Sequence, residues 1–568
     1  RHIPMAEHFD LLIRGGTLVD GSGATRRAGE VGVREGRIAA IGTPDELGGD
    51  ADEIVDATGA VVSPGFIDVH THYDAQLFWD SMLSPSPWHG VTTAVIGNCG
   101  FGVAPTRSRD RDLILRTLEN VEGMSLSALK AGLGEEWPFE SFPEYLDAVE
   151  SRNNAINLAV LIGHTPLRTF VMGEKAVTDL ATKDQVAEMK TIVTEALEAG
   201  AIGFASSKAP THVGYDGNPV PSRVAAVEEI NQIADALRDS PHGVLQATAG
   251  SGFFTKQFAE IYRRTGKPVS WTALLTDLMP TELIEGVLKT TTELQSEGVA
   301  VYPQVTGRPL MFEFDLRAPF PLESHPAMQI ISKTPFDERE ARYRDPEIRK
   351  SIIEAFMHST GFGSKIPGMA ISHHPADESL LERTLGDVAE ERGISAMELA
   401  IDLSLETGLE TRFRMAAANT DEAMVGKLLN HPATMLGLSD AGAHASQLCD
   451  AGASTHLLGH WVREKGALTL EEAVRRLTAQ PAEIFGITDR GRLETGLAAD
   501  IAIFDPETVG CDRVRRVHDF PGGADRLVAD AFGMRAVIVN GVVLRENNES
   551  RLSPSDSLPG LVLRGGHA

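Results

Sequence analysis

Residues 64–74 read PGFIDVHTHYD and place two histidines, two positions apart, at the end of an apolar run. In a strand the side chains at positions i and i+2 point to the same face, so we expect His70 and His72 to face one point. Two neutral imidazoles that converge in this way can hold a divalent metal ion. Two histidines that only form hydrogen bonds at the end of a strand would give the same pattern, so other parts of the chain are needed to distinguish these interpretations.

The charge balance argues against several classes of partner. The 568 residues include 80 acidic and 52 basic side chains, which gives a formal net charge of −28. This charge repels nucleic acids and anionic membrane surfaces, and no apolar run reaches the roughly 18 residues of a membrane-spanning helix. Cys99, Cys449 and Cys511 are too widely spaced for a disulfide framework, which favours a cytoplasmic location. We expect a small-molecule substrate, no nucleic-acid or membrane partner, and leave self-association into a homo-oligomer open.

Both ends of the chain consist of short β-branched segments separated by Gly-Gly, Asp-Gly and Glu-Gly pairs, a pattern typical of hairpins. Residues 5–63 and 487–548 are therefore predicted to form one small composite β-sandwich. Two independent β units would show the same pattern.

Between these ends, in residues 64–486, apolar segments alternate with amphipathic helical patterns. This alternation is typical of a parallel sheet that helices cover on both faces. Eight segments predict an α/β fold with a closed (β/α)8 barrel of the TIM type, whose chemistry lies at the carboxyl ends of the strands. The predicted strands are GFIDVHT (65–71), VTTAVIGN (91–98), INLAVLIGH (156–164), AIGFASS (201–207), GVLQATA (243–249), KPVSWTALL (267–275), VAVYPQVTG (299–307) and ATMLGLSDAG (433–442).

Residues 308–392 interrupt the alternation before the last predicted strand. They begin with a segment rich in proline and phenylalanine and continue with two helical patterns. A long insertion on the face that carries the chemistry usually acts as a lid or supplies a substrate pocket. His373 and His374 could reach the site if the insertion closes over it, while a solvent-facing pair is the simpler interpretation.

Two further residues fall at strand ends near His70 and His72. Strands one and eight are neighbours in a closed barrel, so Asp440 should lie beside both histidines, where it could bind the metal and accept a proton from water. Cys99 follows the second strand and offers a soft thiolate. Taken singly, a cysteine is usually a buried apolar residue and a strand-end aspartate usually caps a helix. Four metal-binding residues on three adjacent strand ends favour a metal site.

Several motifs carry a resemblance to a known family. The stretches ADEIVDATGAVVSPGFIDVHTHYD (51–74), SDAGAH (439–444) and DRGRLETGLAADIAIFDPETV (489–509) resemble the amidohydrolase superfamily over nearly the whole chain. VTTAVIGNCGFGVAPT (91–106), LIGHTPLR (161–168) and GAIGFASS (200–207) are similar to its N-acyl-D-amino-acid deacylase (D-aminoacylase) branch. The resemblance implies a (β/α)8 barrel, a small β-sandwich built from both termini, and a lid inserted before the last strand.

The same resemblance implies a zinc site, from which this sequence departs. Family members hold zinc with the first-strand histidine pair, the cysteine after strand two, one histidine each from strands five and six, and the strand-eight aspartate. Here Gln246 stands in strand five, and residues 270–272 (Ser-Trp-Thr) stand in strand six. His70, His72, Cys99 and Asp440 remain, which suits one zinc ion better than two, because a catalytic zinc needs about three protein ligands and water. Gln246 could still be a weak ligand or donate a hydrogen bond to the substrate.

Four other residues are candidates for the same site. His164 ends strand three and has either a catalytic role or a packing role. Lys208 follows strand four, where other branches of the superfamily carry a carboxylated lysine, and here is either a surface or a substrate-facing residue. His444 either lines the pocket or caps a loop. Arg308 either clamps a substrate carboxylate or forms a salt bridge within the insertion.

These features indicate a metal-dependent hydrolase of a C–N bond, most simply an amide. The metal would lower the pKa of water and polarise the carbonyl, and Asp440 would move the proton from the water to the leaving amine. The resemblance implies an N-acylated amino acid as substrate, although a cyclic amide, carbamate or lactone could use the same groups. A catalytically silent barrel that binds a small ligand is the alternative that the absent histidines favour. A metal-assisted lyase or isomerase is a third.

Overall fold

A closed barrel of eight parallel strands forms the centre of the molecule. The computed structural model describes residues 8–48 and 50–568. Thr71 forms a parallel bridge with Ala441, and the His72 N–H donates to the Ala441 carbonyl at 2.7 Å, which joins the first strand to the last. Each of the eight predicted segments holds one strand, so the predicted barrel is confirmed. In sheet order the strands are β16 (Met435–Leu436), β12 (Val301–Val305), β11 (Val269–Thr272), β10 (Val244–Thr248), β9 (Gly203–Ser207), β8 (Asn157–Gly163), β7 (Val91–Ile96) and β6 (Phe66–Asp68).

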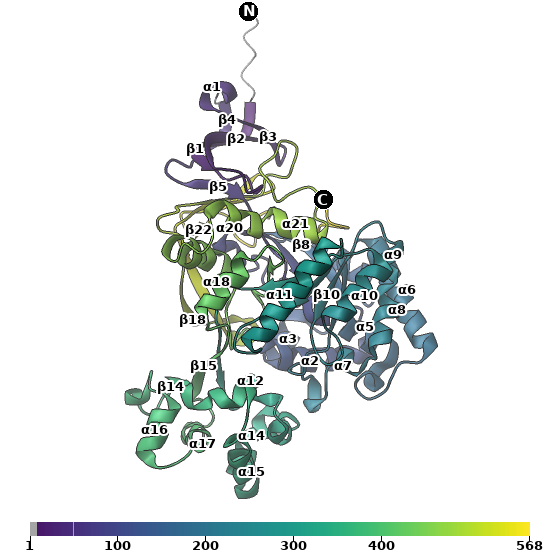
Figure 1. The fold of residues 1–568 in the computed structure, drawn as a ribbon, viewed down its shortest axis with the longest axis vertical. Coiled ribbons are helices and arrows are strands. Elements are labelled where there is room, and N and C mark those ends of the chain that lie inside the picture. The colour runs from purple at the N-terminus through teal and green to yellow at the C-terminus, as the bar shows by residue number, and fades with distance from the viewer. Residues whose placement is uncertain (1–7, 49) are drawn as a thin grey trace, which may run out of the picture.

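Amphipathic helices cover the outside of the barrel (Figure 1). Helix α6 (Lys183–Ala199) illustrates how the sequence sets them: the Thr182 side chain accepts from the Gln185 N–H in a capping box, and Gly200 ends the helix in the left-handed region at φ 114°. Its buried stripe against the barrel is Val186, Met189, Val193, Ala196 and Leu197. Other helices of this outer layer are α5 (His164–Met172), α10 (Thr255–Thr265), α11 (Thr281–Ser296), α18 (Glu422–Asn430) and α20 (Leu470–Leu477).

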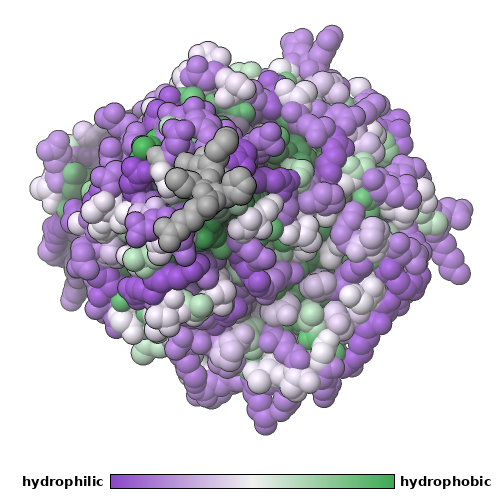
Figure 2. Space-filling model, turned by 90° about the horizontal axis from the view of Figure 1, so that it is seen from above, coloured by the Kyte–Doolittle hydropathy of each residue, from purple (hydrophilic) through white to green (hydrophobic). Residues whose placement is uncertain are grey.

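Strands from both ends of the chain share one sheet of nine strands. The order is β22-β21-β20-β17-β5-β1-β2-β3, with β4 also paired to β1. The pairing of Val62 on β5 with Ile503 on β17 joins the two halves. This unit lies at one end of the molecule (Figure 1), and hydrophilic side chains cover most of its outer face (Figure 2). Its strands are β1 (His8–Leu18), β2 (Arg27–Arg34), β3 (Arg37–Gly42), β4 (Asp50–Asp56), β5 (Val61–Pro64), β17 (Ile501–Phe504), β20 (Met534–Val539), β21 (Val542–Glu546) and β22 (Glu549–Ser550).

A two-stranded ribbon within residues 487–548 lies outside this sheet. Strands β18 (Gly510–Phe520) and β19 (Ala524–Phe532) pair only with each other among the described residues. The Leu527 N–H donates to the Ala445 carbonyl at 2.7 Å, which ties the ribbon to the barrel. The composite unit expected over this range therefore excludes the ribbon, because the ribbon packs its apolar residues against the barrel.

An inserted lobe, residues 310–418, separates β12 from the last barrel strand (Figure 1). A three-stranded antiparallel sheet, β13 (Leu310–Asp315), β15 (Arg412–Ala418) and β14 (Ala370–His373), connects it to the barrel. The lobe is longer than the expected insertion over 308–392, because β15 returns to pair with β13. Its helices include α12 (Phe320–Glu323), α15 (Pro346–Phe356), α16 (Leu385–Arg392) and α17 (Ala396–Glu406). Its own core includes Phe314, Met328, Tyr343, Ile352 and Leu399.

None of the helices in the described residues has the length and apolar character needed to cross a bilayer.

Candidate metal centre

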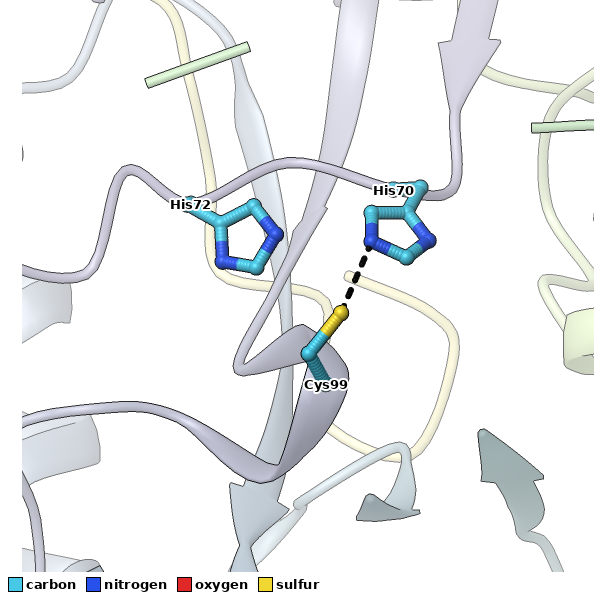
Figure 3. A group of neighbouring side chains, drawn as sticks. All are labelled: His70, His72 and Cys99. Atoms are coloured by element: carbon cyan, nitrogen blue, oxygen red, sulfur yellow. Dashed lines mark hydrogen bonds between the residues drawn. The ribbon is translucent and has the colours of Figure 1, made fainter. Parts of the chain in front are cut away.

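Four side chains from three adjacent strand ends meet at the mouth of the barrel. His70 and His72 follow β6, Cys99 lies in the turn η3 (Asn98–Gly100) after β7, and Asp440 follows β16. The sulfur of Cys99 lies 3.3 Å from Nε2 of His70, and Oδ1 of Asp440 lies 3.2 Å from Nε2 of His70 and 3.4 Å from Nε2 of His72. Figure 3 shows the two rings and the sulfur directed toward one another.

The spacing of these donor atoms suits one shared ion. Zinc bonds of about 2.0–2.3 Å in tetrahedral geometry place neighbouring donor atoms about 3.3–3.7 Å apart, which is close to the separations of 3.2–3.4 Å in three pairs: His70 with Cys99, His70 with Asp440, and His72 with Asp440. One donor atom each from His70, His72 and Cys99 lie within 4.8 Å of one another, and all three residues are buried. Two imidazoles, a thiolate and a carboxylate are all ligands that zinc accepts.

The backbone at the site is strained. Cys99 has φ 58°, Asp440 has φ 48° and His444 has φ 47°, in the left-handed region that costs a non-glycine residue about 1–3 kcal/mol. Such strain persists where the surrounding structure fixes the residue, and it concentrates at functional sites. The turns after β7 and β16 are therefore shaped to direct Cys99 and Asp440 inward.

Two residues lie directly behind the histidines, and neither was predicted from the sequence. Gln304 on β12 accepts a hydrogen bond from Nδ1 of His70 at 2.9 Å, which turns Nε2 of that ring toward the cluster. Glu122, the last residue of α2 (Arg111–Glu122), has Oε1 3.3 Å from Nδ1 of His72. A glutamine within an apolar strand is a signal that could have identified Gln304. Glu122 gives no comparable signal.

Residues of the two strands that lack the expected histidines support this arrangement. The side-chain oxygen of Gln246 accepts the Cys99 N–H at 2.6 Å, so Gln246 holds the turn that carries the cysteine. Ser270 accepts a hydrogen bond at 2.8 Å from Gln304, which in turn holds His70. Gln246 does not line the cavity described below, and its oxygen faces the Cys99 backbone.

The cluster favours the ionised forms of Cys99 and Asp440. Burial raises the pKa of Cys99, but His70 and the hydrogen bonds from both imidazoles bring it down to about 7. Burial opposes charge on Asp440 as well, yet hydrogen bonds from His70 and His72 hold its pKa well below the usual range. Burial lowers the pKa of His70, whereas Cys99 and Asp440 raise it to about 10. Thiolate and carboxylate are the metal-binding forms, and a divalent cation supplies the positive charge that this anionic pair attracts.

The four-residue cluster opens into a cavity of about 310 Å³, the central cavity. Barrel loops and the inserted lobe both contribute to its wall. The residues that line it are His72, Cys99, Phe101, Val121, Glu122, Ala209, Pro210, Thr211, His212, Thr248, Ala249, Thr272, Ala273, Leu275, Leu278, Met279, Leu310, Phe312, Phe320, Leu438, Asp440, Ala443 and His444.

Two histidines line the central cavity beyond the cluster. The ring of His444 packs against Phe320 and Phe312 of the inserted lobe, with centroids 4.2 and 5.4 Å away, and its Nδ1 has no hydrogen-bond partner. His444 therefore lies where the sequence expected a pocket residue. His212 was missed, although it follows strand four at the reactive end of the barrel. Its Nδ1 shares a 2.7 Å hydrogen bond with the Ser207 hydroxyl.

His164 lies behind the cavity wall and does not line the cavity. Its Nε2 lies 2.9 Å from Oε1 of Glu229 and its Nδ1 lies 2.8 Å from the Ser206 hydroxyl. Arg168 also donates to Glu229, at 3.0 Å. Both ring nitrogens are therefore engaged in a buried network, and the packing role that the sequence left open fits this geometry in place of the catalytic one.

Lys208 and Arg308 are engaged away from the cavity. Nζ of Lys208 donates to the carbonyls of Arg223 and Ala225 at 2.6 and 2.5 Å. Arg308 donates from Nε to the buried carboxylate of Asp450 at 2.9 Å. Neither residue lines the cavity, so the structure does not bring the two expected substrate-binding side chains to it.

The histidine pair of the inserted lobe is divided between solvent and core. His373 is exposed, whereas His374 is buried and bonds to the Thr411 hydroxyl at 2.8 Å. Neither lines the central cavity.

Comparisons with known proteins agree with this architecture. Residues 53–545 match the model of the Amidohydrolase family. A D-aminoacylase from Alcaligenes xylosoxydans xylosoxydans is 31% identical over 538 residues, covering 94% of this chain and 94% of that protein.

Two solved structures are also similar. The crystal structure of N-acyl-D-glutamate deacylase from Bordetella bronchiseptica, complexed with zinc and a phosphonate mimic of the tetrahedral intermediate, has a TM-score of 0.67 and 27% identity and covers 98% of this chain and 100% of that chain. A D-aminoacylase structure that describes one-metal activation and second-metal attenuation at a binuclear centre has a TM-score of 0.68 and 26% identity, with the same coverage. These matches confirm the resemblance to the N-acyl-D-amino-acid deacylase branch.

Proposed function

The chain belongs to the amidohydrolase family, and from this premise we propose that it hydrolyses the amide bond of a small N-acyl compound with one zinc ion. By likeness to the named deacylases the substrate is an N-acyl amino acid or a related small amide. The observation that carries the proposal is the convergence of donor atoms at the barrel mouth, where His70 lies 3.3 Å from Cys99 and Asp440 lies 3.2 and 3.4 Å from His70 and His72.

The protein side chains divide the work of the reaction. His70, His72, Cys99 and Asp440 would hold the ion, which supplies a Lewis acid for the carbonyl and lowers the pKa of water. Asp440 accepts the proton of the attacking water and delivers it to the leaving nitrogen, so that the C–N bond breaks as a C–O bond forms. Gln304 and Glu122 keep the imidazoles oriented during both transfers.

Two observations support a single ion. Gln246 and Ser270 lie in the two strands that lack the expected histidines and form hydrogen bonds with Cys99 and Gln304. One-metal activation is described for a structurally similar D-aminoacylase. We also propose that the enzyme works in the cytoplasm on a small-molecule substrate, which the three free cysteines support.

Zinc content and hydrolysis together test the proposal. The purified protein should contain about one zinc per chain and release free amine from N-acyl substrates, and chelation should abolish release. His70→Ala should lose both the zinc and, since a catalytic metal contributes several kcal/mol, at least about 10³-fold of the rate. His373→Ala, at an exposed histidine of the inserted lobe, is the matched control and should keep both.

Two outcomes would overturn the proposal. One is hydrolysis that survives complete removal of metal. The other is a stoichiometry of two zinc ions per chain, both required for full activity.

A further inference from the structure

We propose that the substrate is an uncharged amide with apolar groups on both sides of the scissile bond, and that a free carboxylate on the substrate is rejected. This inference rests on the proposed function and narrows its substrate from an N-acyl amino acid to a related small amide. An N-acyl amine, or an N-acyl amino acid whose carboxyl group is blocked, belongs to this class.

Apolar side chains form most of the wall of the central cavity. Loops after the barrel strands contribute Leu275, Met279 and Leu438, and the inserted lobe contributes Phe312 and Phe320. Cavities of this composition bind ligands mainly by removing apolar surface from water. The hydroxyls that line the cavity belong to threonines and can hydrogen-bond a neutral amide without requiring a charged partner.

The charged side chains of the cavity are acidic. Glu122 and Asp440 line it together with Cys99, and Oε2 of Glu122 has no hydrogen-bond partner. A divalent cation in the cluster would be balanced by the thiolate of Cys99 and the carboxylate of Asp440, and Glu122 then adds one further negative charge. A substrate carboxylate would thus enter a site that is not positively charged even with metal bound.

The basic side chains near the cavity are held by other groups. Among the described residues that line the cavity there is no lysine or arginine. Lys208 donates to two backbone carbonyls, Arg308 pairs with Asp450, and Arg223 donates to the His212 carbonyl at 3.0 Å. An anion that leaves water without a cationic partner carries a large desolvation cost.

The two lining histidines do not replace these cations at neutral pH. Burial lowers the pKa of His212 to about 3, and burial also lowers the pKa of His444 despite the nearby Asp440 and Glu122. Both rings are therefore neutral and can donate or accept a hydrogen bond, which again suits an uncharged amide.

A matched pair of substrates tests the inference. N-Octanoyl-D-leucine and N-(3-methylbutyl)octanamide share one skeleton and differ only by the carboxylate. We expect kcat/KM to be at least about tenfold higher for the amide that lacks the carboxylate. In the sulfonamide analogues of these two compounds, a sulfonyl group replaces the carbonyl and prevents hydrolysis. The analogue without the carboxylate should bind more tightly in calorimetric titrations of both the zinc-loaded and the metal-free protein.

An engineered cation provides a second test. Leu278 lines the cavity and is 47% exposed, and Leu283, on α11, is 49% exposed and does not line it. Leu278→Arg should shift the preference toward the acid by about threefold to fivefold, the effect of a partly solvated ion pair. Leu283→Arg adds the same charge outside the cavity and should leave the preference unchanged.

The outcomes separate this inference from the proposed function. The inference is overturned if the acid is hydrolysed faster or bound more tightly than the amide without the carboxylate, and amide hydrolysis then still stands. It is also overturned if Leu278→Arg leaves the preference between the two substrates unchanged. If neither amide is hydrolysed by zinc-loaded protein, the proposed function fails, and the calorimetric order of the sulfonamides still decides the inference.

Discussion

The two metal-facing imidazoles are held by chemically different partners. Gln304 offers His70 a neutral amide oxygen, whereas Glu122 places a buried carboxylate beside His72. A carboxylate behind a metal-bound histidine raises the basicity of the ring and fixes its orientation. We therefore assign Glu122 a positioning role that acts through His72.

Replacing Glu122 should weaken metal binding without unfolding the protein. Glu122→Gln keeps the size of the side chain but removes its charge, and we expect zinc affinity to fall by about 10–100-fold, measured by competition with a chromophoric chelator. Glu119→Gln, three residues earlier on the same helix, is the matched control because the Glu119 carboxylate accepts the Leu126 N–H. Equal zinc affinity in the two variants would contradict the assigned role.

The meeting of His70, His72, Cys99 and Asp440 could be predicted from sequence because each follows an apolar strand, and strand ends of a barrel share one rim. Glu122 could not be predicted in this way, since it reaches the rim from the end of a helix. The roles of Lys208 and Arg308 depend on which partners fold against them. Arg308 meets Asp450 more than a hundred positions away, a pairing that no local pattern encodes.

At the scale of elements, the inserted lobe completes the wall of the central cavity. Its strand β13 and helix α12 place Phe312 and Phe320 against the ring of His444. The start of the lobe was visible in the sequence as a change in composition. Its end was not, because RFRMAAA (412–418) becomes a strand by pairing with β14 and with β13, which lies about a hundred residues earlier.

Removing an aromatic ring of the lobe should weaken substrate binding more than turnover. For Phe320→Ala we expect KM for an apolar amide to rise about tenfold with kcat nearly unchanged, because the ring contributes apolar contact to bound substrate and transition state alike. Steady-state kinetics measures both constants. Phe336→Ala, in the same lobe but outside the cavity wall, is the control and should not raise KM, and a fall in kcat with constant KM for Phe320→Ala would contradict this account.

At the scale of the whole molecule, the buried side chain of His89 links the ribbon of β18 and β19 to the barrel. Nε2 of His89 donates to the Ala529 carbonyl at 2.8 Å, and its Nδ1 lies 2.7 Å from the Thr455 hydroxyl. Burial lowers the pKa of His89 to about 4. Between pH 4 and pH 6.5 the folded state therefore keeps this ring neutral, whereas in the unfolded chain the histidine has a pKa of about 6.5 and is protonated.

This histidine should make the protein sensitive to acid. Below pH 6.5 the unfolded state binds more protons than the folded state, so the free energy of unfolding falls as the pH drops toward about 4. In His89→Gln we expect a smaller loss of Tm between pH 7.5 and pH 5 than in the wild type, measured by calorimetry. His518→Gln alters an exposed histidine of the same ribbon and should keep the wild-type loss, and parallel losses in all three proteins would refute the assignment.

The order of synthesis leaves one strand of the nine-stranded sheet without its neighbour for a time. β5 leaves the ribosome early. The strand β17, whose Ile501 pairs with Pro64 of β5, leaves it only after the entire barrel has been made. At synthesis rates of about 5–20 residues per second the delay is on the order of half a minute or more. Throughout that interval the backbone amides and carbonyls along one side of β5 lack their final neighbour, and such an edge can recruit a strand from another nascent chain. The four residues of β5 offer little length for such pairing, so the brevity of that strand protects the growing polypeptide until β17 has been made.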